Sequence, residues 1–451
     1  MVIPKGIYAY TKDQIVKINH MNYKVTSVDL HYLAFLNADN VVGELVIPET
    51  VPDGHGTTFT VTGVTYMGGY DCKMITSVKL PESITYLDAG VFSGASLESI
   101  NIPKKVERIE ENANTQLKKV PKYTVSPDNP HFSSDSDGAL YSRDGKTLRF
   151  VPSSVPLTGG TYTVKPNVEI IKNSCFSLID GLKKIVLPPS LKEISVGYPS
   201  IAPLNSLEEF AIAGGGTTPF RTEGGVLCKG EELMLYPRAK NTEDYTVPSS
   251  ITTLAGFAIA YPEKMKTIDL NRVTSLAKSS LFSAYKLTTI TLPKELKKYD
   301  STTKKGMEPG CFGACTKVDK YIVPEENTDF VAVNGVIYSK PEKDILYFYP
   351  AGKPGDTYDI LPTTKVIEAL AFWSVQSLTA MTFPVGLESI NDEAFRQLPK
   401  LENVTFTEPS DVKHLGTAVF RACPKLKVVT LPSKVTSLDK PFDGCSNLET
   451  I

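Results

Sequence analysis

The sequence has 451 residues, of which 41% are hydrophobic and 22% charged, with a net charge of −2. This balance is typical of a folded protein, and the length fits two to four globular domains or one long array of repeats. Acidic and basic residues are interspersed without a basic stripe, which argues against nucleic-acid binding. No apolar run approaches the ~18 residues that a membrane-spanning helix requires.

Residues 1–70 are predicted to form several strands separated by turns. The apolar segments are GIYAYTKDQIVKI, YKVTSVDL, VVGELVIPETV and TFTVTGVTYM. The first residues lack the basic-then-apolar pattern of a signal peptide, so the protein either stays inside the cell or its sequence begins after a removed signal. Because residues 1–70 do not follow the period found in the rest of the chain, we predict that they form an all-β cap.

Residues 71–451 repeat with a period of about 23 residues. A small residue followed by Phe recurs, with Phe at positions 372, 395, 420 and 442, and a Leu stands six residues after each of them. From that Leu runs a pattern of alternating aliphatic residues ending in Pro, then two more aliphatic positions. It is plain in ITSVKLPESITYL (75–87), LESINIPKKVERI (97–109), LKKIVLPPSLKEI (182–194), LTAMTFPVGLESI (378–390) and LKVVTLPSKVTSL (426–438).

The alternation within each unit predicts a short strand, which the Pro ends because it cannot donate a ladder hydrogen bond. One unit cannot bury enough apolar surface to offset the entropy of ordering its residues, so the units must stack. The sequence therefore predicts a solenoid. We expect one parallel ladder to run through the inward residues Val78, Ile100, Ile185, Ile290, Met381, Val404 and Val429.

Three longer units interrupt the repeats at about 123–152, 210–237 and 321–350. Each contains a Phe, then a Gly, an apolar segment, a charged turn, a second apolar segment and a Pro, which predicts a β-hairpin. The three glycines are Gly138, Gly225 and Gly335, and their spacings of 87 and 110 residues differ by 23, one repeat. The hairpin units therefore belong to the register of the solenoid.

The units resemble the BspA-like class of leucine-rich repeats found on bacterial cell surfaces. The resemblance rests on the Ala-Phe or Val-Phe pair, a Cys three residues after the Phe, and the Leu-Pro strand end, over roughly residues 70–451. It implies a β-rich leucine-rich-repeat solenoid of ~23-residue units with three hairpin-containing long units and an N-terminal β cap. It also implies an extracellular or cell-surface location and a role in adhesion.

The seven cysteines occupy repeat positions rather than the spacings of a metal site. Cys72, Cys315, Cys423 and Cys445 share the position three residues before the Leu-type residue, where other units have Ala95 or Val375. Cys175 and Cys311 precede a Phe, and Cys228 is in a hairpin unit. This pattern favours buried free thiols, with a disulfide or a metal site as the alternatives.

No catalytic motif stands out, so we expect a non-enzymatic protein with no cofactor and no metal. The five histidines lack metal spacing, and neither a zinc-protease nor a serine-hydrolase motif occurs. Candidate ligand contacts are Arg149, Met234 and Tyr347, which share one face of the second hairpin strand, and the single tryptophan, Trp373. The alternative is that these residues pack on an adjacent repeat.

The predicted function is a cell-surface or secreted scaffold that engages a protein ligand in binding or adhesion. The alternative is a carbohydrate-binding surface protein of a gut-type bacterium, for which exposed aromatic residues in a row would be the distinguishing feature. The expected partners are therefore a protein or a glycan at the cell surface, without nucleic acid.

Overall fold

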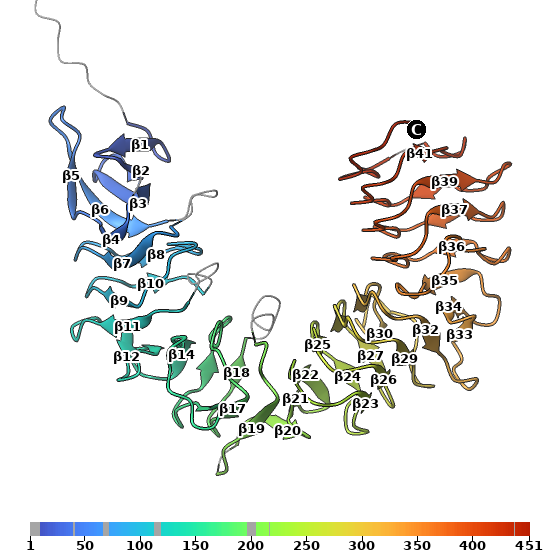
Figure 1. Cartoon of the computed structure of the whole chain (residues 1–451), viewed down its shortest axis with the longest axis horizontal. Helices are drawn as coiled ribbons and strands as arrows, with labels where there is room; N and C mark the ends of the chain where they lie inside the picture. Colours follow the sequence, from blue (N-terminus) through green and yellow to red (C-terminus); the bar gives the residue numbers. More distant parts are fainter. Residues whose placement is uncertain are drawn as a thin grey trace, which may run out of the picture. The chain divides into compact units, whose positions relative to one another are not determined.

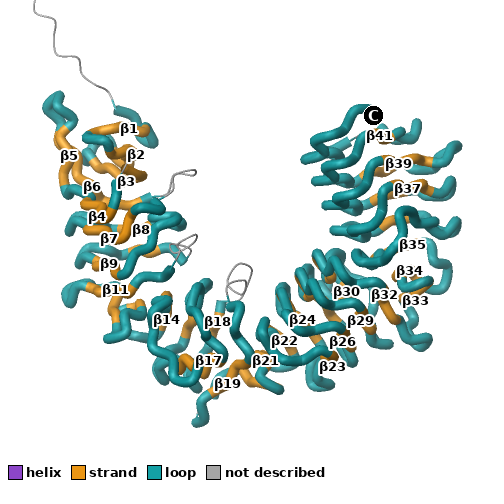
Figure 2. The backbone as a smooth tube through the Cα atoms, in the orientation of Figure 1, coloured by secondary structure: helices purple, strands orange, loops and turns teal. Residues whose placement is uncertain are grey.

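The structure, a computed structural model, describes residues 10–38, 41–65, 72–111, 119–195, 204–215, 217–436 and 438–451. Every regular element within these ranges is a β-strand (Figure 2). The chain divides into two compact units, one of Met1–Ser206 with Ile212–Thr218 and the other of Leu207–Ala211 with Pro219–Ile451. The predicted cap lies partly outside the described residues, at 1–9, 39–40 and 66–70. Among the described residues no helix could cross a membrane.

Each unit is a β-solenoid, which confirms the predicted fold class. The parallel strands at the Leu-Pro position of the repeat, several of which lack the Pro, form what we call the first ladder. They are β4 (Gly43–Val46), β7 (Ile75–Lys79), β9 (Ser99–Ile102), β11 (Lys122–Val125), β15 (Thr161–Thr163), β17 (Lys184–Leu187), β19 (Glu209–Ile212), β23 (Asp244–Thr246), β26 (Thr267–Asp269), β29 (Thr289–Thr291), β32 (Lys320–Ile322), β37 (Ala380–Phe383), β39 (Asn403–Phe406) and β41 (Val428–Val429).

A second ladder consists of two-residue strands that follow the Pro. They are β8 (Tyr86–Leu87), β10 (Arg108–Ile109), β16 (Ile170–Ile171), β18 (Glu193–Ile194), β24 (Thr253–Leu254), β27 (Ser275–Leu276), β30 (Gly306–Met307), β36 (Val366–Ile367), β38 (Ser389–Ile390) and β40 (His414–Leu415). The core lies between the two ladders, because alternate residues such as Ile100 and Ile102 are buried while Ser99 and Asn101 are exposed.

The first ladder is parallel and in register, but it is divided into segments. Val78 pairs with Ile100, and Met381 with Val404 and then Val429, as predicted (β37, β39 and β41 in Figure 1). The expectation of one ladder through all seven residues is wrong, because Ile100 pairs next with Tyr123 and Ile185 pairs with Tyr162. The ladder stops and restarts around each long unit.

Each long unit forms a three-stranded antiparallel sheet that we call a meander. The first meander is β12 (Phe132–Ser134), β13 (Leu140–Ser142) and β14 (Thr147–Phe150); the second is β20 (Phe220–Glu223), β21 (Val226–Lys229) and β22 (Glu232–Leu235); the third is β33 (Phe330–Val333), β34 (Val336–Ser339) and β35 (Ile345–Phe348). The last strand of each pairs in parallel with the second ladder, as Leu346 does with Ile367.

The glycine of each meander accounts for the end of a first-ladder segment. The Gly138 carbonyl accepts a hydrogen bond from the Tyr123 N–H at 2.9 Å, and Gly335 does the same for Tyr321 at 3.0 Å. Both glycines have φ above +80°, and a Cβ on Gly138 would lie 2.7 Å from the Cβ of Lys122. Only glycine therefore lets the meander approach the strand this closely.

The strands before the first repeat extend both ladders. They are β1 (Ile15–Ile18), β2 (Met21–Ser27), β3 (Tyr32–Ala38), β5 (Thr50–Pro52) and β6 (Thr58–Val64), and β6 pairs in parallel with β8. Leu45 of β4 pairs with Val78 of β7. The statement that residues 1–70 lie outside the repeat is therefore wrong for β4, whereas the domain boundary at residue 70 stays a prediction.

The third meander packs against apolar cores on both of its faces. Ile337 and Phe348 belong to a core that includes Leu287 and Ile290 of the preceding repeats. Tyr338 and Leu346, together with Tyr349 just after β35, belong to a core that includes Phe372 of the following repeats. Alternation within the strands directs successive side chains to opposite faces, so one meander completes two cores.

Candidate functional site

Arg149, Met234 and Tyr347 occupy the same position in the last strands of the three meanders. Arg149 is partly buried, and its guanidinium lies 5.4 Å from the centre of the Phe132 ring and donates a hydrogen bond to the Ile109 carbonyl. Burial lowers the pKa of Arg149, while the neighbouring Glu111 and Glu110 act in the opposite direction. Arg149 is thus packed on its own meander.

The second meander carries a partly exposed Met234 at this position. In this meander the cation over the leading phenylalanine belongs to another residue: the Lys229 ammonium lies 5.7 Å from the centre of the Phe220 ring. Phe220 is the counterpart of Phe132, the first residue of the first meander. Two meanders therefore place one of their own cations over the leading phenylalanine.

Tyr347 does not lie on an outward face, which corrects the predicted orientation. It is 8% exposed, and its ring packs edge to face on Phe330 with 5.0 Å between centroids. Burial raises the pKa of Tyr347 to about 12, with smaller contributions from the negative charges of Glu368, Asp329 and Asp344. Ligand contact by Arg149, Met234 and Tyr347 stays a prediction.

A cavity of about 290 Å³, which we call the meander cavity, lies beside Tyr347. Its lining residues are Lys298, Thr328, Asp329, Ser339, Lys340, Glu342, Asp344, Ile345 and Tyr347. The hydroxyl is the polar atom in the side chain of Tyr347, which is itself a lining residue of this cavity. It makes no hydrogen bond with any residue that the structure describes.

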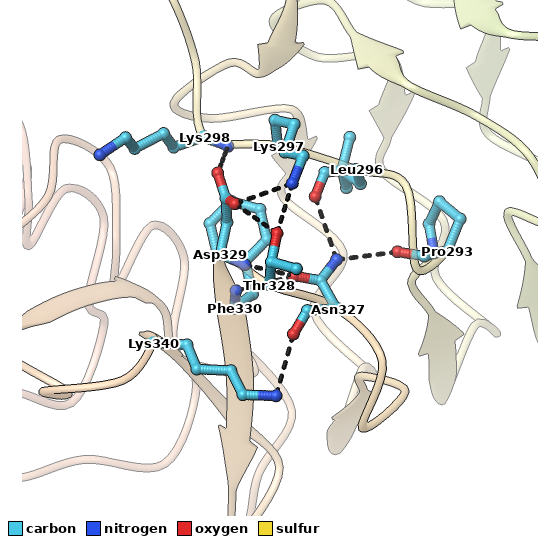
Figure 3. Close-up of polar contacts among 9 residues, drawn as sticks. All are labelled: Pro293, Leu296, Lys297, Lys298, Asn327, Thr328, Asp329, Phe330 and Lys340. Atoms are coloured by element: carbon cyan, nitrogen blue, oxygen red, sulfur yellow. Dashed lines mark hydrogen bonds and ion pairs between the residues drawn. The ribbon is translucent and has the colours of Figure 1, made fainter.

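One side of the meander cavity is fixed by a buried asparagine (Figure 3). The Asn327 amide donates to the carbonyls of Pro293 at 2.9 Å and Leu296 at 3.0 Å. Its Oδ1 accepts from the backbone N–H groups of Asp329 at 2.9 Å and Phe330 at 2.8 Å. The two bonds that the amide donates reach the preceding repeat, and the two that Oδ1 accepts hold the start of β33 to Asn327.

The charges around Asn327 are largely paired. Burial acts to raise the pKa of Asp329, but hydrogen bonds from the Lys298 N–H, Thr328 and Lys297 bring it below its usual value. The Lys340 ammonium donates to the carbonyls of Glu325 at 2.6 Å and Asn327 at 3.0 Å. Figure 3 shows the Lys298 side chain extending away from Asp329.

Trp373 belongs to a second feature, on the turns that follow the second ladder. Three of these turns pair as a small parallel sheet of β25 (Ile259–Ala260), β28 (Leu281–Phe282) and β31 (Phe312–Gly313). The position after the inward Phe or Leu is outward, and in successive repeats it holds Phe282, Gly313, Trp373, Arg396 and Arg421. We call these five residues the turn column.

Gly313 brings the aromatic residues of the turn column together. A Cβ at Gly313 would lie 2.5 Å from the Trp373 ring and 3.0 Å from the Phe282 ring. Without that atom the two rings approach to 6.1 Å between centroids. On its other side Trp373 is covered by the Arg396 guanidinium at 5.3 Å, and its Nε1 donates to Gln397 at 2.8 Å.

More aromatic side chains adjoin the column. Phe257 and Tyr261 pack edge to face on Phe282 at 5.1 and 5.6 Å, and Tyr285 is 53% exposed beside Tyr261. The Arg238 guanidinium lies 5.3 Å from the centre of the Tyr261 ring. With the turn column, these residues make a partly exposed surface of aromatic and arginine side chains.

The seven cysteines are free thiols, and five of them are buried. Cys423 donates to the Phe395 carbonyl and Cys445 to the Phe420 carbonyl, each at 3.0 Å. Within the described part of the chain, no group of three or more His, Cys, Asp or Glu residues is arranged to hold a metal ion.

Solved structures of bacterial proteins resemble the chain along nearly its whole length. A leucine rich cell surface protein from Faecalibacterium prausnitzii is 17% identical, with a TM-score of 0.37, over 98% of this chain and 88% of that one. A leucine-rich repeat protein from Eubacterium ventriosum is 18% identical, with a TM-score of 0.45, over 95% of this chain and 93% of that one. The pneumococcal vaccine antigen PcpA is 17% identical, with a TM-score of 0.32, over 98% of this chain and 88% of that one. No curated protein matches the chain.

The sequence profile of the BspA type leucine rich repeat region (6 copies) matches residues 60–135, 160–208, 236–332 and 356–451. These ranges cover more than half of the chain, and the gaps between them contain the last two strands of the first meander, all of the second and most of the third. The chain therefore belongs to the BspA-type leucine-rich repeat family.

Proposed function

We propose that the protein is a non-enzymatic scaffold, at the cell surface or secreted, that binds a protein ligand through the turn column. The observation that carries this proposal is the partly exposed surface of Phe282, Trp373 and Arg396 with neighbouring tyrosines. Tryptophan, tyrosine and arginine are the residues that dominate binding energy at protein interfaces. Family membership supports the location, because the BspA-like class is typical of bacterial surface proteins.

A carbohydrate ligand is the second candidate, and the aromatic residues in a row favour it. A sugar ring stacks best on an aromatic face that is free. Here the Arg396 and Arg238 guanidinium groups lie over the rings of Trp373 and Tyr261, and Phe282 packs against Trp373 with the two rings tilted by 50°. Because these faces are occupied, the column offers ring edges and guanidinium groups, which suits a protein surface better than a glycan.

The scaffold arrangement also agrees with a non-catalytic role. Burial in the core raises the pKa values of Tyr321 and Cys175, and the same cause is the largest for the other buried tyrosines with raised pKa values, such as Tyr245. Perturbed groups at catalytic sites instead converge on a cleft and on a reacting atom. We therefore assign these groups to packing and the turn column to binding.

The test is an array of immobilised extracellular-matrix proteins and glycans, probed with the purified protein and with Trp373→Ala. We expect the unmodified chain to bind at least one protein on the array and Trp373→Ala to lose most of that signal. A control is Val385→Ala, which removes an exposed apolar side chain, 40% accessible, outside the column. Binding to glycans alone would favour the second candidate, and equal binding by Trp373→Ala would refute the column as the site.

A further inference from the structure

The three meanders differ in what lies over their leading phenylalanine. In the first meander the Arg149 guanidinium covers Phe132, and in the second the Lys229 ammonium covers Phe220. In the third the Tyr347 ring packs on Phe330, and none of the described cations lies over that ring. The fold thus holds a cation of its own at this place twice and lacks one the third time.

The third meander has carboxylates near this place that no lysine or arginine neutralises. Asp344 accepts a hydrogen bond from Ser339 at 2.7 Å through one oxygen, and Glu342 is exposed at the rim. Neither forms an ion pair with a described residue. Of the nearby lysines, Lys297 pairs with Asp329 and Lys340 donates to two backbone carbonyls, while Lys298, on the cavity wall, forms no ion pair with Asp344 or Glu342. Tyr347 lines the same cavity and is 8% exposed, and its hydroxyl makes no hydrogen bond with a described residue.

We propose that the meander cavity binds one cationic side chain of a ligand, the ammonium of a lysine or the guanidinium of an arginine. The cation lies between Asp344 and the Tyr347 hydroxyl, which accepts a hydrogen bond from it, with Glu342 at the entrance. Charge-assisted hydrogen bonds of this kind are the strong ones in a partly buried site. The group supplied from outside takes the role that Arg149 plays in the first meander.

The size of the cavity limits the ligand. At about 290 Å³ it is at the lower end of the range for small-molecule sites, so it accommodates one side chain and not an oligosaccharide. This site does not depend on the turn column, which belongs to other repeats and uses aromatic contacts. Each of the two assignments can fail without the other.

The experiment measures binding of Nα-acetyl-lysine methylamide and Nα-acetyl-arginine methylamide to the full chain by NMR titration. The matched neutral probe is Nα-acetyl-norleucine methylamide, which has the lysine stem without its charge. We expect saturable binding of at least one cationic probe and weaker binding at higher salt, because part of the attraction is electrostatic. Equal binding of the neutral probe, or no binding of either cationic probe, would overturn the proposal.

Variants locate the site. Asp344→Asn should weaken binding of the cationic probe about tenfold, the loss expected for one charge-assisted hydrogen bond. Tyr347→Arg should abolish it, because the chain would then fill the site as Arg149 does. The control is Asp319→Asn, which changes an exposed carboxylate outside the cavity. This variant should bind the cationic probe as tightly as the unmodified chain does.

Should Asp344→Asn fail to fold, as judged by circular dichroism, Glu342→Gln provides the same test from the exposed rim, with a smaller loss. A cationic probe that binds Tyr347→Arg and Asp344→Asn as tightly as the unmodified chain would place binding elsewhere and refute the assignment. So would a loss of the same size in Asp319→Asn.

Discussion

The first and third meanders are anchored by the same buried asparagine, and the second is not. Asn129 donates to the carbonyls of Pro103 and Val106 and accepts from the N–H groups of His131 and Phe132, the bonds that Asn327 makes in the third meander. The second meander has Thr217 at the corresponding position, and the hydroxyl of the neighbouring Thr218 donates to the Leu191 carbonyl at 2.7 Å.

The chain divides into its two compact units at this second meander, between Thr218 and Pro219. A buried amide that satisfies two donors and two acceptors fixes the start of a meander through four hydrogen bonds. The comparison therefore teaches that meanders of one backbone design can begin with different anchoring side chains.

Asn327→Ala should give the largest loss of stability. It leaves two backbone carbonyls and two N–H groups without partners in the interior, which we expect to cost about 4 kcal/mol in the free energy of unfolding. Denaturant titration followed by circular dichroism measures it, and Asn129→Ala should behave alike. Asn101→Ala, on the exposed face of β9, is the control. A loss under ~1 kcal/mol would show that the asparagine is no anchor.

Gly313→Ala should have an intermediate effect. The added methyl meets the Trp373 ring at 2.5 Å, so the ring must move, at a cost of about 1–3 kcal/mol. Because the chain has one tryptophan, its fluorescence reports the turn column directly, and we expect emission to shift to the red. Gly386→Ala is the matched control, with 3.7 Å to its nearest neighbour. Unchanged emission in Gly313→Ala would contradict the packing described.

A smaller effect concerns the dependence of stability on pH, which we expect to differ between the third meander and the first. The folded pKa of Asp329 is below its usual value, so this carboxylate contributes stability above the unfolded pKa of ~3.9. That contribution disappears as pH falls through the folded value. Asp329→Asn should therefore lower stability at neutral pH and reduce the loss seen on acidification below pH ~4.

The measurement for Asp329 is thermal unfolding between neutral pH and pH ~3. Asp137→Asn changes an exposed carboxylate of the first meander and serves as the control. If Asp329→Asn and the control depend on pH in the same way, the hydrogen bonds to Asp329 do not stabilise the third meander.

The smallest effect is one of reactivity, without a change in fold. The neighbouring Cys445 thiol and burial raise the pKa of Cys423, and the neighbouring Cys423 thiol lowers the pKa of Cys445 to about 7. Alkylation of the native protein should therefore modify the half-buried Cys445 before the buried Cys175 and Cys311. Mass spectrometry under denaturing, non-reducing conditions should then find most thiols free. Two or more native disulfides would overturn the packing interpretation of these positions.

Local alternation predicted most of the fold. The Leu-Pro pattern predicted β7, β9, β17 and β37 because a strand with one buried face leaves a period of two in the sequence. The same signal was present in Leu45, Ile47 and Pro48 but was attributed to the cap. The first strand of each meander was missed, since three or four residues after a Phe are too short to show a period.

Only some of the candidate site residues could be predicted from the sequence. Trp373 stood out as the one tryptophan, yet Phe282 lies 91 residues earlier and gave no sign of contact with it. The third meander is inserted between the repeats that carry Gly313 and Trp373, so neighbours in the column are 60 residues apart in the chain. Tyr347 was expected outside because alternation was extrapolated from Phe348. The packing of β33 over it, which alternation does not encode, buries it.

The two-faced third meander has a consequence for how such a chain can change in length. Ile337 of the third meander belongs to the core of the preceding repeats, and Tyr338 belongs to the core of the following repeats. The meander therefore covers the end of each of these two cores separately. A whole repeat can then be added or removed between two meanders while the contacts of the meanders with the cores stay the same. The meander glycines, 87 and 110 residues apart, differ by one repeat of 23. The third meander thus separates two apolar cores, and the number of repeats between neighbouring meanders can differ by a whole repeat without a change in the meanders themselves.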